Sequence, residues 1–249
     1  MSNHLATLGF TGIDGSDLES LAKKCFQNGK ATRGKHGTYI VWPLGNGIEV
    51  WIQLSLEEEL VGINPHFFGK TRTSAGLMLR VPRDGFPMDG GFVALAQPYG
   101  NDPIRGAFRF VFDTPNYLTH EELKLPVITT VQLTAFAQQI AFVDSDKDFA
   151  SLAARQGASL TSEAFVPLGF AGKNREPLAE PVASAMVCGL ILDGQQITNP
   201  MTKVPFWRLR IRNVAGEMDV VASAELVPRP PKLGGVIQCS AWISGRITD

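Results

Sequence analysis

The sequence predicts an α+β protein of two domains, with a mixed antiparallel-sheet domain over residues 1–170 and a small β-barrel domain over residues 182–249. Residues 206–225 alternate apolar and polar side chains, which is the period of a half-buried strand pair. Residues 18–26 carry apolar side chains at helical spacing. Residues 171–181 lack apolar periodicity and contain two prolines, which indicates a linker between the domains.

Composition sets the broad class. The chain has 249 residues, of which 44% are hydrophobic, so it can bury a substantial core. Its 23 basic and 24 acidic residues nearly cancel, and no net field attracts it to nucleic acid or to an anionic membrane. Three widely spaced cysteines, Cys25, Cys188 and Cys239, argue for a reducing compartment, and we expect the cytoplasm. No stretch approaches the roughly 20 apolar residues of a membrane helix, and the N-terminus lacks the pattern of a secretory signal.

The N-terminal elements are expected in the order strand, helix, strand, strand. Residues 5–13 are typical of a strand, and a helix follows from a cap at residues 15–17 to a stop at residues 28–29. Residues 38–42 and 48–54 are two further strands, joined by a turn that contains Asn-Gly, a strong hairpin signal.

This order resembles one module of the vicinal oxygen chelate (glyoxalase-like) group over residues 1–80. Modules of that family pair to hold a metal ion and a small substrate, and they draw ligands from His, Gln and Glu on their strands. The resemblance implies His4, Glu49 and His66 as metal ligands or acid/base groups. The residue spacing itself shows no paired histidines and no Cys-x-x-Cys, so neither a structural zinc site nor a cofactor is expected.

The middle of the chain predicts short strands and one more helix. Residues 77–81, 91–97 and 108–112 are strands separated by Pro- and Gly-rich turns. Residues 127–143 form a longer apolar run that we predict as a strand, although its second half also fits a helix. A helix capped at residues 144–145 continues to residue 155.

The last third predicts a hairpin with one apolar face and one basic face. A turn at residues 215–216 would place Ile211 opposite Val220 and Arg212 opposite Asp219. The side chains predicted to face the interior are Trp207, Leu209, Ile211 and Val220.

With flanking strands at residues 183–192 and 236–247, this hairpin resembles a small OB-like barrel. OB folds bind oligonucleotides on the corresponding face, and the resemblance implies Arg208 and Arg210 as phosphate contacts and Phe206 as a stacking platform. Residues 183–249 hold only seven basic and five acidic side chains, so nucleic acid is not the expected partner.

A candidate ligand site lies on the strand at residues 48–54. Its apolar face is committed to the core, and Glu49, Trp51 and Gln53 project from the other face. This second face is either solvated or lines a cavity or an interface, and the tryptophan adds weight to a cavity or an interface because exposed tryptophans are uncommon.

Residues 62–71 resemble a phosphate loop, but six residues separate the two glycines where the motif requires four. We therefore predict a turn that packs Phe67 and Phe68 into the core. His66, Lys70 and Arg72 around this turn are candidates for an anion or ligand site.

Three functional hypotheses follow. The first is a non-catalytic cytoplasmic binding or assembly protein that recognises a small molecule or a protein through Glu49, Trp51, Gln53 and residues 66–72; the lack of a complete catalytic motif favours it. The second is a glyoxalase-like small-molecule enzyme, with or without a metal. The third is weak single-strand nucleic-acid binding by the OB-like barrel.

Overall fold

The structure is a computed structural model that describes residues 4–12, 15–155, 160–170 and 180–248. It has two α-helices and thirteen strands in this part of the chain, which confirms the α+β class. None of the described helices is long and apolar enough to span a membrane. The predicted linker, residues 171–181, lies for the most part outside the described residues.

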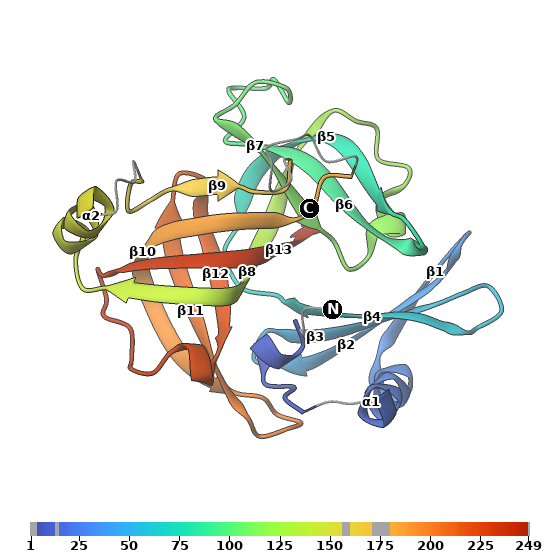
Figure 1. Cartoon of the computed structure of the whole chain (residues 1–249). Coiled ribbons are helices and arrows are strands. Elements are labelled where there is room, and N and C mark those ends of the chain that lie inside the picture. The colour runs from blue at the N-terminus through green and yellow to red at the C-terminus, as the bar shows by residue number, and fades with distance from the viewer. Residues whose placement is uncertain (1–3, 13–14, 156–159, 171–179, 249) are drawn as a thin grey trace.

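The strands form two sheets, shown in Figure 1. Four antiparallel strands make the first sheet in the order β1-β2-β3-β4, and helix α1 precedes them. Their bounds are α1 Gly15–Asn28, β1 Lys30–Gly34, β2 Gly37–Gly45, β3 Ile48–Leu54 and β4 Leu60–Phe67. The second sheet has nine strands, and α2 (Asp146–Arg155) follows its longest strand. These strands are β5 Thr73–Arg83, β6 Phe86–Ala96, β7 Phe108–Asp113, β8 Val127–Val143, β9 Phe165–Pro167, β10 Ser184–Thr198, β11 Pro205–Asn213, β12 Gly216–Ser223 and β13 Val236–Ile247.

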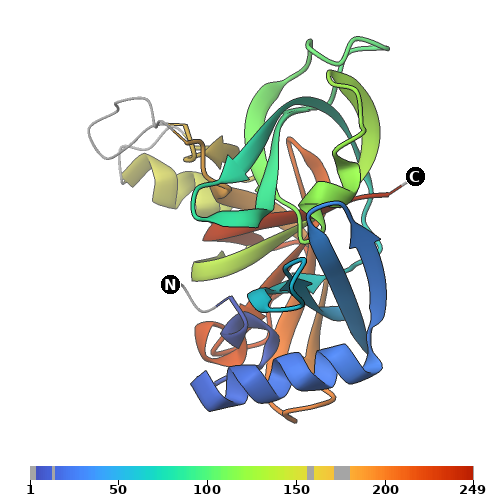
Figure 2. The same cartoon turned by 90° about the vertical axis from the view of Figure 1, so that its right-hand side faces the viewer.

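Helix α1 forms as predicted and packs across β2 and β3, as Figure 2 shows. Leu21, Ala22 and Cys25 are buried on its inner face, whereas Phe26 is exposed. The predicted strand at residues 5–13 is wrong, because residues Ala6–Leu8 form a short 3-10 turn. The apolar pattern there reflects packing of Leu8 and other side chains into the core, not pairing with a neighbouring strand.

The β2–β3 hairpin is confirmed, with Asn46 and Gly47 at positive φ in its turn. Strand β4 lies where the sequence analysis predicted a turn. It pairs with β3 along its whole length, and Glu49 lies opposite His66. The turn was predicted because Pro65 is unusual within a strand. Pro65 is tolerated because β4 is at the edge of its sheet, where a missing N–H costs no ladder bond.

The nine-stranded sheet closes into two rings that share the β8–β13 pair. One ring contains β8, β12, β11, β10 and β13, and the other contains β8, β5, β6, β7 and β13.

The predicted strands at residues 77–81, 91–97, 108–112 and 127–143 are confirmed as parts of β5, β6, β7 and β8. Helix α2 is confirmed as well, and the Ser145 hydroxyl caps it by accepting from the Asp148 amide. Strand β8 therefore joins the predicted C-terminal strands to the strands that precede the predicted linker.

The β11–β12 hairpin keeps its predicted faces but not its predicted register. Its turn is at residues 214–215, so Leu209 pairs with Val220 and Arg210 with Asp219. The predicted pairs are displaced by two residues. A shift of two leaves every side chain on the same face, because side chains alternate along a strand. Trp207, Leu209, Ile211 and Val220 are buried as predicted.

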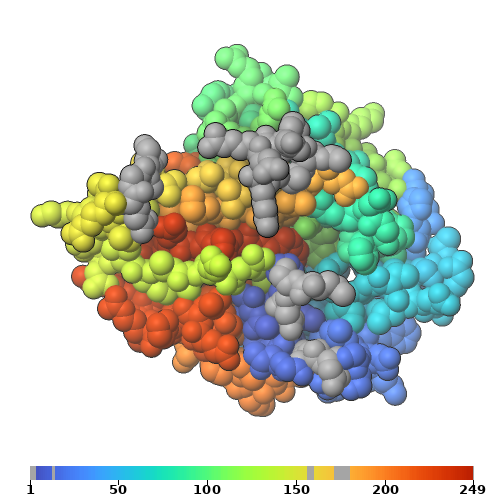
Figure 3. Space-filling view, in the orientation of Figure 1, coloured from blue at the N-terminus to red at the C-terminus, as the bar shows by residue number. Residues whose placement is uncertain are grey.

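The four-stranded sheet packs against the outside of the nine-stranded sheet. Leu8 and Ile52 share a hydrophobic cluster with Phe136, Phe206 and Val221 of β8, β11 and β12. Figure 3 shows the N-terminal part, in blue and cyan, lying directly against the rest of the chain. All seven residues of β3 are buried, so both faces of this strand are covered. The two sheets therefore meet over a surface that includes side chains expected to be accessible.

Candidate functional site

His66 is the centre of a buried polar network between the two sheets. Its Nδ1 lies 2.9 Å from Ser244 Oγ on β13, and its Nε2 lies 2.9 Å from Gln132 Oε1 on β8. The Gln132 amide nitrogen donates to the carbonyl of Leu133 and to Thr134 Oγ1, which directs Oε1 to the histidine. We therefore assign the proton to Nε2, and Ser244 donates to the unprotonated Nδ1.

His66 is fully buried, and burial lowers its pKa from 6.5 to about 3, with the positive charge of Arg246 acting in the same direction. The ring is neutral at neutral pH. The sequence placed His66 between Pro65 and two aromatic residues, where an imidazole needs partners. Ser244 and Gln132 are those partners, and both come from the far half of the chain.

The His66 network predicts a pH-dependent stability. The unfolded chain binds a proton at this histidine below about pH 6.5, whereas the folded chain does not do so until about pH 3. The free energy of unfolding should therefore fall as the pH drops from 6.5, with a contribution of up to about 1.4 kcal/mol per pH unit from this group. Urea unfolding of the wild type and of His66→Gln at about pH 7 and about pH 5 isolates this contribution. Equal losses in both proteins would contradict it.

Glu49, Trp51 and Arg246 form a second cluster at the same interface. Arg246 Nη1 donates to Glu49 Oε1 at 2.9 Å, and Trp51 Nε1 donates to Glu49 Oε2 at 3.0 Å. The Arg246 guanidinium also lies 4.7 Å from the ring centre of Phe68. Burial raises the pKa of Glu49, and this effect outweighs the opposing effect of Arg246.

The part of the predicted partner surface that lies on β3 is thus an interface inside the molecule. Glu49, Trp51 and Gln53 are 8%, 4% and 1% exposed. The expectation of a cavity or an interface behind Trp51 fits this placement, but the interface lies between the two sheets of one chain and leaves no surface for a partner. His66 is buried in the same layer.

Lys70 and Arg72 lie in the segment that connects the two sheets. Arg72 donates to the carbonyls of Gly69 and Thr71 and stacks on Phe68, so its charge is held by its own loop. Lys70 is exposed and lines an open groove of about 600 Å³.

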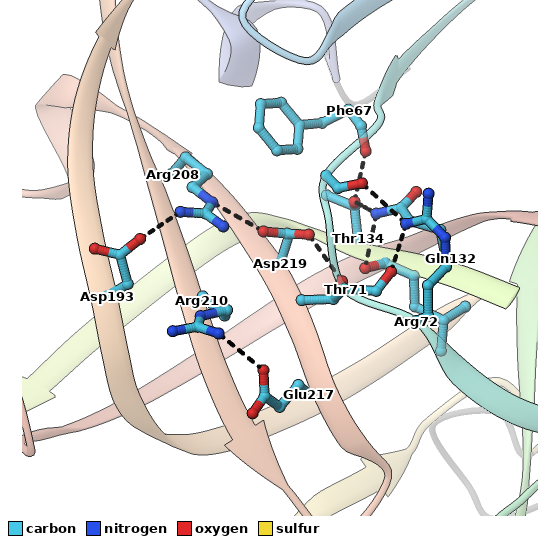
Figure 4. A network of polar contacts seen from close by, with 12 residues as sticks. Phe67, Thr71, Arg72, Gln132, Thr134, Asp193, Arg208, Arg210, Glu217 and Asp219 are labelled. Carbon is cyan, nitrogen blue, oxygen red and sulfur yellow. Dashed lines mark hydrogen bonds and ion pairs between the residues drawn. The ribbon is translucent and has the colours of Figure 1, made fainter.

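Arg208 and Arg210 of the β11–β12 hairpin line the same groove but are paired with acids, and Figure 4 shows these pairs. Arg208 binds Asp193 and the buried Asp219, and Arg210 binds Glu217. Phe206 is fully buried, so its ring is not available to stack on a base.

A pocket of about 350 Å³ lies where the two sheets meet, and we call it the junction pocket. Its polar and charged lining comes from β4, from the β5–β6 hairpin, from the end of β7 and from β13. The lining residues are His4, Asn64, Arg83, Asp84, Phe86, Asp89, Gly90, Asp113, Thr114, Pro115, Glu180, Trp242 and Ser244.

Asp89 is held in the junction pocket by two amides. Its Oδ1 accepts from Gln53 Nε2 at 2.5 Å and from Asn64 Nδ2 at 2.7 Å. Its Oδ2 accepts no hydrogen bond from the described residues, and no described cation pairs with it. Gln53, which the sequence singled out, thus acts by orienting a carboxylate that the sequence did not.

Asp113 is the second carboxylate of the pocket, and each of its oxygens has a partner. Arg83 pairs with Oδ1, and Trp242 Nε1 donates to Oδ2 at 2.7 Å. Burial raises the pKa of Asp113, against the opposing effects of Arg83 and Trp242. His4 stacks on Trp242 with the ring centres 4.2 Å apart, and burial lowers the pKa of His4 to about 4.

Sequence reasoning missed most of these residues. Trp242 had a signal, because it alternates with buried residues on the polar side of the last strand, where a large aromatic side chain indicates a covered face. Asp89 and Asp113 had none, since each follows an ordinary strand or turn pattern. They meet only because β6 and β7 pair beside the first sheet.

The metal candidates of the glyoxalase-like resemblance are engaged in other bonds. Glu49 and His66 lie opposite each other on β3 and β4, yet Glu49 binds Arg246 and both ring nitrogens of His66 have partners. His4 stacks on Trp242. In the part of the chain that the structure describes, no three His, Cys, Asp or Glu side chains are grouped so that they could hold a metal ion.

The fold and the site define an α+β protein with a polar pocket at the junction of two sheets. Comparison of the chain with protein families, with curated proteins and with solved structures finds no match.

Proposed function

We propose that this chain is a non-catalytic binding protein whose ligand is a small molecule held in the junction pocket. The observation that carries the proposal is Asp89, a carboxylate fixed through one oxygen while the other has no partner among the described residues. The volume of about 350 Å³ falls at the lower end of the range of small-molecule sites.

The rigidity of the pocket supports the proposal. Asn64, Asp89 and Asp113 are held by hydrogen bonds within the protein, so a ligand would bind without first ordering these three side chains. Its walls come from two sheets joined by the His66 network. All three cysteines are free and buried, which agrees with the cytoplasmic location that forms part of the proposal.

Fluorine NMR of protein labelled with 5-fluorotryptophan tests the proposal. The chain has four tryptophans, and Trp242 lines the pocket while Trp207 does not. A panel of amines, polyols and carboxylates is titrated, and the Trp242 resonance is assigned with Trp242→Phe. We expect at least one compound to shift Trp242 in a saturable way and to leave Trp207 in place.

If no member of the panel shifts Trp242 at millimolar concentration, the proposal fails. A shift of Trp242 and Trp207 together would indicate a general change in the protein and would also count against a local site.

A small-molecule enzyme is the second candidate, and one observation favours it. Ser244 lines the junction pocket and donates to His66, whose other nitrogen is oriented by Gln132. This is the order of a nucleophile, a base and an orienting group. A fluorophosphonate probe should label the wild type and not Ser244→Ala if the serine is a nucleophile. Absence of labelling in both proteins would remove this candidate.

The two resemblances enter the proposal at the level of architecture. The ring of β8, β12, β11, β10 and β13 supports an OB-like part, for which a filter-binding titration with single-stranded DNA tests nucleic-acid binding. Of the glyoxalase-like order, helix α1 and the later β2–β3 hairpin remain, whereas the predicted first strand is a 3-10 turn and β1 follows the helix. Elemental analysis tests a metal at His4, Glu49 or His66.

A further inference from the structure

We infer that the ligand of the junction pocket is a small organic cation, such as a primary ammonium attached to a single ring. The inference rests on the proposed function and names the ligand class of the same pocket.

The charges around the pocket support this class. Among the lining residues that the structure describes, four are carboxylates, Asp84, Asp89, Asp113 and Glu180, and one is permanently cationic, Arg83. The Arg83 guanidinium is already engaged within the protein, because it pairs with Asp113 and donates to the Pro181 carbonyl. A negatively charged ligand would therefore meet an excess of like charge and no available cation among the described lining residues.

The direction of the hydrogen bonds in the pocket independently supports a cationic ligand. Within the pocket Trp242 donates to Asp113, Asn64 donates to Asp89, and Ser244 donates to His66. These donors point at acceptors of the protein, whereas Asp89 Oδ2 is an acceptor without a described donor. A ligand that complements the pocket must supply a donor there, and a charged N–H donor to a carboxylate forms a stronger bond than a neutral one.

The apolar part of the lining fits the rest of such a ligand. Phe86, at 53% exposure, stands at the rim, and Pro115 and Trp242 add further apolar surface. A phenylalanine ring attracts a cation within about 6 Å of its centre, by about 0.5–1 kcal/mol at an exposed site. A neutral polyol would gain the hydrogen bond but neither the ion pair nor this attraction.

Isothermal titration calorimetry with benzylammonium, benzyl alcohol and benzoate tests the inference. These three probes share a ring and differ in charge. We expect benzylammonium to bind at least about tenfold more tightly than benzyl alcohol, the difference of a charge-assisted hydrogen bond. Asp89→Asn should weaken benzylammonium at least about tenfold. Glu57→Gln, the same loss of charge on an exposed turn outside the pocket, should change the affinity less than about twofold.

Phe86→Ala provides a reading that does not depend on the bonds of Asp89 to Gln53 and Asn64. It should weaken benzylammonium by about two- to fivefold and leave benzyl alcohol less affected. Unchanged binding in both Asp89→Asn and Phe86→Ala overturns the inference.

The outcomes separate the ligand class from the proposed function. If benzyl alcohol, benzoate or a polyol shifts the Trp242 resonance and benzylammonium does not, the pocket binds ligands and the cationic class is wrong. If no compound shifts Trp242, the proposed function fails and the inference fails with it.

Discussion

Replacement of Asp219 by alanine is expected to lower the free energy of unfolding by about 3–5 kcal/mol. The Asp219 carboxylate is fully buried; it accepts from Arg208 Nε at 2.9 Å and from Thr71 Oγ1 at 2.8 Å. Without it, the largely buried guanidinium of Arg208 keeps only the half-exposed Asp193 as a counterion. Urea unfolding followed by circular dichroism measures the loss.

Glu217→Ala is the matched control on the same strand. Its pair with Arg210 spans 3.3 Å, and both side chains are more than 40% exposed. Exposed ion pairs contribute about 0–1 kcal/mol, so the control should lose less than about 1 kcal/mol. Equal losses in the two variants would show that Asp219 does not hold the connecting segment to the hairpin.

Gly69 shows how closely this segment approaches Asp219. A Cβ at Gly69 would lie 1.8 Å from Asp219 Oδ2, which is too short for any non-bonded contact, so only glycine fits at this position. The segment between β4 and β5 is therefore fixed by a backbone contact as well as by Thr71.

His66→Ala is expected to cost about 3–5 kcal/mol of stability at neutral pH. The substitution leaves Ser244 and Gln132, which are 1% and 0% exposed, without their histidine partner. Each unsatisfied buried group costs about 1–3 kcal/mol, and the empty ring volume adds a cavity term. Urea unfolding measures the difference.

His36→Ala provides the comparison, because His36 is about half exposed and contacts only Glu121 among its described ionic partners. It should change stability by less than about 0.5 kcal/mol. A small effect of His66→Ala would mean that the polar layer between the sheets is not required to hold them together.

Local pattern predicted the elements whose partners are close in the sequence. Helix α1, the β2–β3 hairpin and the long strand β8 follow from apolar period and turn residues. The β11–β12 hairpin has the predicted faces, but its turn is displaced by one position toward the N-terminus. Period two determines which side chains face inward and leaves a shift of two residues open.

Contacts between distant segments were not predictable in this way. Strand β3 has one apolar and one polar face in sequence, yet both are buried because β13 and β6 supply polar partners, Arg246 for Glu49 and Asp89 for Gln53. Pro65 made β4 look like a turn, since the sequence does not show that the strand lies at an edge.

The sequence predicted one residue that orients the candidate site, but it did not predict the residues that line the pocket. Gln53 belongs to the polar face that the sequence selected, and it orients Asp89. Asp89, Asp113 and Trp242 come from three strands whose adjacency is a property of the rings, and no spacing along the chain brings them together.

A crystal structure of the protein grown with benzylammonium chloride would show directly whether the junction pocket binds an organic cation. We expect the ligand in the junction pocket, with its nitrogen about 3 Å from Asp89 Oδ2 and its ring beside Phe86. A benzylammonium ion bound only elsewhere on the protein, or a junction pocket filled by the protein's own side chains, would contradict this expectation.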